Sequence, residues 1–203
     1  MIDLEKSSDV FILRGDHLAI SFLHVGDRWQ HRVGGHDGEN WLPILTSEEG
    51  AADSAATGGP VLQDLRCEEL AGGAVEFQGL GQAGRAFYSA AIRFDSAAQS
   101  IDFDLCVRAP GIPGQFAMVS RYLVADGATV QQRADLLVVS RGRVAVAVEP
   151  VAIPGNTQGE CCLIIDGAVR RIVAGCVEAP EPIACGKGVS VRWRYQMRLP
   201  GSP

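Results

Sequence analysis

Dipeptides that favour tight turns recur along this chain, each between runs of alternating or apolar residues. Five of them stand out: Gly26-Asp27, Gly72-Gly73, Asp126-Gly127, Arg141-Gly142 and Asp166-Gly167. Asp-Gly and Gly-Gly pairs readily adopt the positive backbone angles of turns whose twist matches that of paired strands. Their spacing therefore predicts consecutive antiparallel hairpins and, with them, an all-β fold.

Residues of alternating polarity lie between these turns, as expected of strands that bury one face. The clearest case is 189–199, where Val191, Trp193, Tyr195 and Met197 alternate with Arg192, Arg194, Gln196 and Arg198. We expect the polar side of this strand to be wet or ion-paired. The other predicted strands are 10–13, 17–25, 28–33, 41–46, 61–70, 74–80, 85–94, 100–108, 116–125, 128–133, 136–140, 143–148, 161–165 and 168–173.

Glycine and proline mark the predicted connections. Residues 34–40 (GGHDGEN) predict a mobile loop. Residues 79–84 (GLGQAG) predict a bend or bulge instead of a dinucleotide-binding loop, because no helix follows them. Prolines in 108–115 predict a connection at which the chain changes sheets. The small polar residues of 47–60 are typical either of a functional loop or of a frayed segment.

One domain over 1–203, with short flexible ends at 1–8 and 200–203, fits this pattern. The chain has 203 residues, of which 47% are hydrophobic, so it can bury one sizeable core. Many short strands and no long amphipathic helix favour two antiparallel sheets packed face to face, and a flattened β-barrel is the alternative.

Several partner classes are excluded by composition. A net charge of -6 gives no basic footprint for nucleic acid or an anionic membrane surface. The start of the chain lacks the basic and apolar regions of a secretory signal, and no apolar run is long enough to cross a bilayer, so we expect a cytoplasmic protein. The four histidines and six cysteines show no metal-ligand spacing, so no metal and no cofactor are expected. A homo-oligomer remains open.

The densest group of potentially functional residue types begins at 26–33 (GDRWQHRV). A sugar site needs a flat aromatic face together with charged groups that bind hydroxyls. The candidate ligand-binding residues are therefore Arg28, Trp29, His31, Arg32 and Trp41. The structural alternative places Trp29 and His31 in the core and both arginines on a solvated strand face.

A catalytic interpretation uses the same region. His31 and either Glu48 or Glu49 are candidates for the acid and the base of a reaction on a sugar. The sequence has no Gly-x-Ser-x-Gly elbow and no order of Ser, His and Asp that suggests a triad, so it does not indicate a serine nucleophile.

The blocks GDRWQHRV, TSEEG, PVLQDL and GLGQAGRAFYSAAI resemble an uncharacterised family of β-rich bacterial proteins. From its early paired strands to the closing RWRYQMRLP, the chain also resembles the supersandwich of galactose mutarotases and of carbohydrate-binding domains in some glycosidases. That resemblance implies a supersandwich-like fold, and mutarotase-like enzymes use a histidine acid and a glutamate base on an open sheet face. We expect a non-catalytic module for a carbohydrate or similar polar ligand. The alternatives are a mutarotase- or epimerase-like enzyme and a structural or assembly protein.

Overall fold

The structure is a computed structural model that describes residues 3–38, 40–48, 59–110, 119–153, 160–166, 169–175 and 189–201. All regular elements in these ranges are β-strands, which confirms the all-β prediction. They form two sheets of eight strands each, in which neighbouring strands run antiparallel.

The first sheet has the strand order β1 (Asp3–Lys6), β2 (Val10–Arg14), β3 (Leu18–Val25), β4 (Arg28–His36), β5 (Trp41–Ser47), β10 (Val119–Val124), β15 (Val169–Gly175) and β14 (Glu160–Asp166). The second sheet has the order β11 (Thr129–Arg133), β12 (Leu136–Arg141), β13 (Val144–Pro150), β16 (Val189–Arg198), β9 (Ser100–Ala109), β8 (Ala86–Asp95), β7 (Ala74–Ala83) and β6 (Asp64–Glu69). Both sheets therefore mix strands from distant parts of the sequence.

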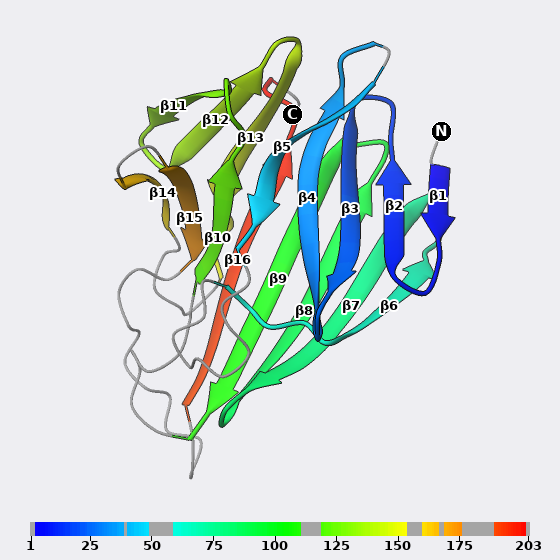
Figure 1. The fold of residues 1–203 in the computed structure, drawn as a ribbon, viewed down its shortest axis with the longest axis vertical. Coiled ribbons are helices and arrows are strands. Elements are labelled where there is room, and N and C mark those ends of the chain that lie inside the picture. Colours follow the sequence, from blue (N-terminus) through cyan, green and yellow to red (C-terminus); the bar gives the residue numbers. More distant parts are fainter. Residues whose placement is uncertain are drawn as a thin grey trace.

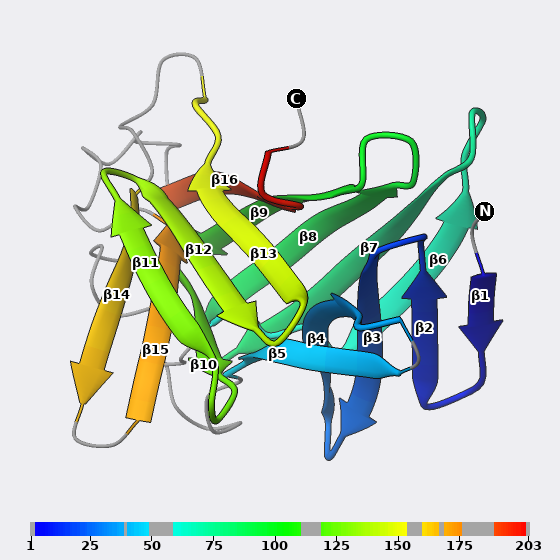
Figure 2. The same ribbon diagram turned by 90° about the horizontal axis from the view of Figure 1, so that it is seen from above.

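The two sheets pack face to face. Figure 1 shows the blue strands β1–β5 in front of the green and teal strands β6–β9, and Figure 2 shows the same strands from above as two separate layers. Among the described residues neither sheet closes on itself, because each order begins and ends with different strands. The two-sheet sandwich is thus confirmed, and the flattened barrel is not what the chain forms.

The core lies between the layers, where every second side chain of each strand points inward. Phe22 of β3 contacts Phe77 of β7 across the sandwich, with ring centroids 4.5 Å apart. The alternation predicted for the last strand is confirmed, because its four apolar side chains are at most 1% exposed: Val191, Trp193, Tyr195 and Met197. Burial of such large side chains is the main favourable contribution to folding here.

Four of the five predicted turns join antiparallel neighbours: β3 to β4, β6 to β7, β12 to β13 and β14 to β15. The glycines at the first three turns have positive φ, 66° at Gly26, 82° and 78° at Gly72 and Gly73, and 61° at Gly142. L-residues with a Cβ rarely adopt these angles, which explains why glycine occupies the turns. Residues 167 and 168 of the fourth turn lie outside the described residues.

The hairpin predicted around Asp126-Gly127 is wrong. The chain does turn there, since the Ala128 amide donates to the Ala125 carbonyl at 3.1 Å. However, β10 belongs to the first sheet and β11 to the second. Both edges of β10 are already paired, with β5 and with β15, so β11 cannot add to it and crosses to the other sheet.

Within 1–8, the segment predicted as a flexible end, Asp3–Lys6 form strand β1. β1 pairs with β2 at the edge of the first sheet. Arg14 of β2 donates to Asp3 at 2.9 Å and to Glu5 at 3.3 Å across this pair. Charged side chains are usual on edge strands because they discourage further pairing, so polarity alone does not exclude a strand. At the other end, 200 and 201 form a turn and 202–203 lie outside the described residues.

Two segments predicted as irregular lie within strands. β4 continues through Gly34 and Gly35 to His36, so the first three residues of the loop predicted over 34–40 belong to a strand. Residues 79–83 are paired regularly with β8, so the predicted bulge is absent there, and the chain bends only at Gly84, where φ is 56°. Glycine permits close packing in both strands, which the sequence does not distinguish from loop formation.

Two other predictions concern the connections of the second sheet. The chain leaves the second sheet after β9 and enters the first at β10, which confirms the change of sheets predicted at 108–115. The strand predicted over 61–70 begins only at Asp64 and ends at Glu69. Of the loop at 47–60, Ser47 ends β5, and 49–58 lie outside the described residues.

Candidate functional site

Trp29 is a core residue. Its side chain is 6% exposed, and its ring centroid lies 5.1 Å from that of Phe11 and 5.0 Å from that of His24. Its amide donates to the Leu62 carbonyl at 2.7 Å, which ties β4 to the segment before β6. A ring so enclosed has no free face for a sugar.

His31 lies between the sheets. It is 3% exposed, and its ring packs 5.7 Å from Phe22 and 5.5 Å from Phe103. Its Nε2 is 2.8 Å from the hydroxyl of Tyr122, which is 2.5 Å from that of Tyr195. Burial lowers the pKa of His31 to about 3, because the charged imidazolium would lose its solvation. The histidine is therefore neutral at pH 7 and part of a hydrogen-bonded chain in the core.

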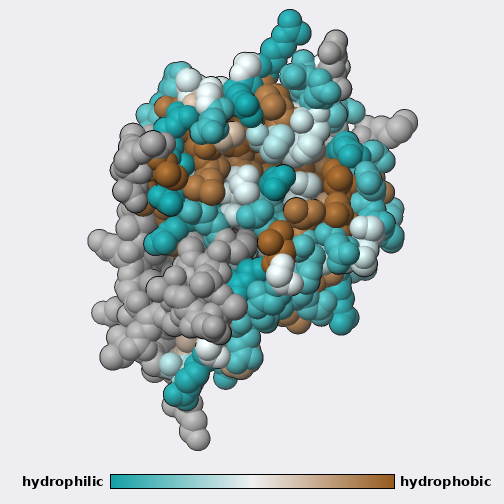
Figure 3. Space-filling model, in the orientation of Figure 1, coloured by the Kyte–Doolittle hydropathy of each residue, from teal (hydrophilic) through white to brown (hydrophobic). Residues whose placement is uncertain are grey.

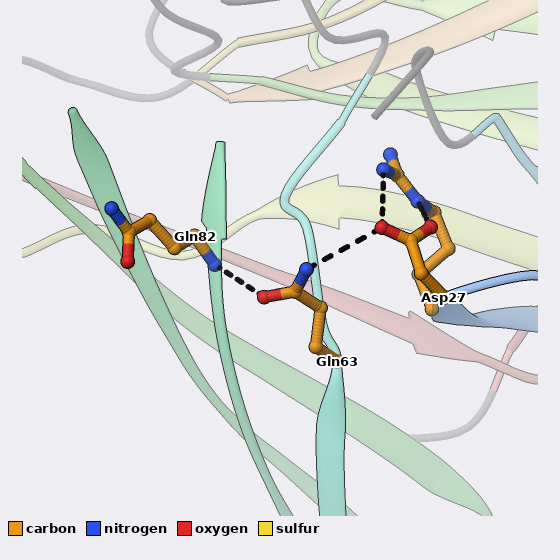
Figure 4. A network of polar contacts seen from close by, with 4 residues as sticks. Asp27, Gln63 and Gln82 are labelled. Atoms are coloured by element: carbon orange, nitrogen blue, oxygen red, sulfur yellow. Dashed lines mark hydrogen bonds and ion pairs between the residues drawn. The ribbon is translucent and has the colours of Figure 1, made fainter. Parts of the chain in front are cut away.

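Arg28 is buried and paired with its neighbour in sequence. Its Nε donates to Asp27 Oδ1 at 2.9 Å, and this hydrogen bond is the largest cause of the lowered pKa of Asp27. Gln63 links this pair to β7. Its side-chain N–H donates to Asp27 Oδ2 at 3.4 Å, and its side-chain oxygen accepts a hydrogen bond from the backbone N–H of Gln82 at 3.0 Å (Figure 4). Figure 4 thus shows a network that fastens the β3–β4 turn to the second sheet.

The other predicted site residues lie apart. Arg32 is exposed, and Trp41 is half-buried beside His36, with ring centroids 6.5 Å apart. Glu48 is held by Arg171, whose Nε donates to its two oxygens at 2.8 and 3.0 Å. Glu49 lies outside the described residues.

The structure does not bring His31 and Glu48 together as an acid and a base. Arg171 alternates along β15 with the core residue Ile172, so the ion pair of Arg171 and Glu48 lies on the outer face of the first sheet. The His31 ring points instead toward Phe103 of the second sheet. A face of the first sheet is shown in Figure 3, where hydrophobic and hydrophilic side chains are interspersed.

A hollow on the outer face of the second sheet is the feature that sequence reasoning missed. Two cavities of about 490 and 540 Å³ adjoin there and share four lining residues: Asp64, Leu80, Ser89 and Cys106. We call the two cavities together the trough. It runs across β6, β7, β8, β9 and β16.

The register of the second sheet explains the shape of the trough. Leu80 pairs with Ser89, Ser89 with Cys106, and Cys106 with Arg192. In an antiparallel sheet, paired residues lie on the same face. The small side chains of Ser89, Cys106 and Ala91 therefore form the floor, and longer side chains of the outer strands rise on both sides.

One part of the trough is apolar. Phe87 is 54% exposed and Leu80 57% exposed, although neighbours in the same strands, such as Tyr88, are almost fully buried. Water contact with so much of a phenyl ring is unfavourable. Exposed aromatic surface in a hollow that also holds polar groups is typical of a ligand site.

The other side of the trough is charged. Asp104 of β9 forms ion pairs with Arg192, whose Nε is 2.6 Å from Oδ1, and with Arg194, whose Nε is 3.5 Å from Oδ2. The hydrogen bond to Asp104 is the largest cause of the raised pKa of Arg192. Farther along β16, Gln196 donates to Asp102 at 2.9 Å and Arg198 to Glu149 at 2.6 Å. The polar side of the last strand is thus ion-paired, as predicted.

In the described part of the chain, no three histidine, cysteine or acidic side chains gather as metal ligands would, and no helix is long and apolar enough to cross a membrane. No protein-family model matches the chain, and no curated protein is significantly similar to it in sequence.

Proposed function

We propose that this protein binds a carbohydrate or a similar polar small ligand in the trough. The observation that carries the proposal is the exposed ring of Phe87 beside a floor of small residues and a wall of charged groups. The apolar face of a sugar ring stacks on an aromatic side chain, while its hydroxyls need donors and acceptors of fixed position. Ser89, Gln82 and Asp64 offer such groups around Phe87.

Of the candidate functions, ligand binding without catalysis is the one that the geometry supports best. Asp104, the carboxylate on the charged side of the trough, is held in ion pairs by Arg192 and Arg194, so its oxygens are already engaged. His31 lies in the core, on the other side of the second sheet from the trough. The pairing of His31 with Glu48 as acid and base therefore has no geometric support.

Replacing the aromatic platform is expected to remove binding. A panel of monosaccharides and oligosaccharides is screened by thermal shift, because a ligand that binds only the folded protein raises its Tm. For a sugar that raises Tm, Phe87→Ala is expected to weaken the affinity roughly tenfold or more, since stacking and apolar contact are both lost. Phe87→Tyr keeps the ring and is expected to retain binding. Titration calorimetry measures both dissociation constants.

Trp41→Ala is the matched control. Trp41 is an aromatic residue that the sequence also marks as a candidate, but it does not line the trough. We expect its replacement to leave sugar affinity unchanged. Loss of binding in Trp41→Ala with retention in Phe87→Ala would place the site elsewhere and overturn the proposal, as would a panel in which no sugar binds.

A further inference from the structure

We infer that the ligand of the trough is an acidic sugar, whose carboxylate, sulfate or phosphate group binds Arg108 while its ring stacks on Phe87. This inference rests on the proposed function and adds the charge of the ligand to it. Phe87 and Arg108 form a directly opposed pair on β8 and β9, so their side chains emerge next to each other on the same face. Both line the larger cavity.

Neither of the two residues paired with Arg108 is acidic. Its paired residues are Phe87 on one side and Ser190 on the other. It is exposed, and within the described ranges its side chain forms no ion pair or hydrogen bond. The arginines of the smaller cavity differ in this respect, because Arg192 is paired with Asp104 and Arg66 lies 3.6 Å from Asp64.

The charge of the trough is opposite in sign to that of the whole chain. Among the described residues, three arginines and two aspartates line its two cavities, whereas the full sequence has a net charge of -6. Each aspartate already has an arginine partner, so of the described residues that line the trough Arg108 is the cation available to a ligand. A guanidinium offers several N–H donors in one plane and matches the oxygens of a carboxylate, sulfate or phosphate group.

Because Arg108 lies beside the ring of Phe87, the site favours a ligand that has both a sugar ring and an acidic group. A free anion gains only the contact with Arg108, which is weak at an exposed site. A neutral sugar gains only the ring and hydroxyl contacts. A sugar ring that carries an acidic group gains both, since the opposed residues of an antiparallel pair have Cβ atoms about 5 Å apart. That distance is within the span of one hexose.

The test compares glucuronate, glucose 6-phosphate and glucose with inorganic phosphate and acetate, each by titration calorimetry on the full chain. We expect the acidic sugars to bind roughly tenfold more tightly than glucose at low salt, and this preference to shrink as sodium chloride is added. Arg108→Gln is expected to lower the affinity for the acidic sugars to that for glucose, and Arg108→Lys to restore part of it. Glucuronate and glucose 6-phosphate distinguish a carboxylate from a phosphate as the preferred group.

Arg93→Gln is the matched control, because Arg93 is an exposed arginine on the same face of β8 that lines neither cavity. Equal affinities for glucose and glucuronate, unchanged in Arg108→Gln, would overturn this inference and leave the proposed function intact. Phosphate or acetate binding as tightly as the acidic sugars would also overturn it, since the ring would then contribute nothing. If no sugar binds, the proposed function fails and the inference fails with it.

Discussion

Acidification is expected to destabilise this protein through the buried residue His31. An imidazole in an unfolded chain has a pKa of about 6.5, whereas in the folded protein burial lowers the pKa of His31 to about 3. Between these values the unfolded state binds a proton that the folded state does not, so the free energy of unfolding falls as the pH falls. At pH 4.5, two units below the unfolded pKa, this coupling amounts to about 3 kcal/mol.

The surroundings of His31 support the low pKa. Its Nε2 is engaged by the Tyr122 hydroxyl, while its Nδ1 is buried without a hydrogen-bond partner among the described residues. With both ring nitrogens protonated, His31 would carry a buried Nδ1–H without an acceptor among the described residues. Above pH 6.5 the residue is neutral in both states, and the contribution to pH dependence disappears.

Urea unfolding of the native protein and of His31→Gln, measured at pH 7 and pH 4.5, tests this prediction. We expect the variant to lose about 1–3 kcal/mol at pH 7, because the ring packing and part of the hydrogen bonding are lost. Its further loss on acidification should be smaller than that of the native protein by about 3 kcal/mol. His17→Gln, at an exposed histidine, is the control, and its free energy of unfolding should change between pH 7 and pH 4.5 as that of the native protein does. If the free energy of unfolding changed equally with pH in the native protein and in His31→Gln, His31 would be protonated as easily in the folded state as in the unfolded one.

The alternation of apolar residues predicted most of the strands, because side-chain direction within a strand depends only on sequence position. β16 and β9 are examples, each with one buried face and one polar face as expected. Pairing between strands, by contrast, does not follow from the local sequence. The turn at Asp126-Gly127 has the local chemistry of a hairpin, but whether its strands pair depends on the occupied edges of β10, which are set by segments far away in the sequence.

The candidate site could not be predicted for the same reason. The sequence places Asp104 and Arg192 on the polar sides of their own strands, yet their contact requires the register of β9 with β16, whose paired residues are 80 or more positions apart. The trough also depends on small side chains at Ser89 and Cys106, whose place in its floor follows from the pairing of β8 with β9 and not from any local motif. By contrast, the composition of 26–33 is rich in reactive types because a buried histidine and a buried arginine stabilise the core and its turn.

Gly34→Ala is expected to be the most damaging single-methyl change in the first sheet. A Cβ at Gly34 would lie 2.0 Å from the Leu42 carbonyl oxygen and 2.8 Å from the Pro43 Cα. Both atoms belong to the backbone of β5, so no side-chain rotation relieves the overlap, and β4 and β5 must separate. The pairing of these strands shifts register between Val33 and Gly34, which marks this close approach. We expect a loss of about 3 kcal/mol or more in the free energy of unfolding.

Gly26→Ala separates this steric effect from the general cost of removing a glycine. Gly26 has a φ of 66°, and a Cβ there would meet no atom within 4 Å, so its replacement carries backbone strain without a clash. That strain costs about 1 kcal/mol. Urea midpoints of the two variants give the comparison directly. If Gly34→Ala were no less stable than Gly26→Ala, β4 and β5 would not approach as closely as the register shift implies, and the extension of β4 to His36 would have to be abandoned.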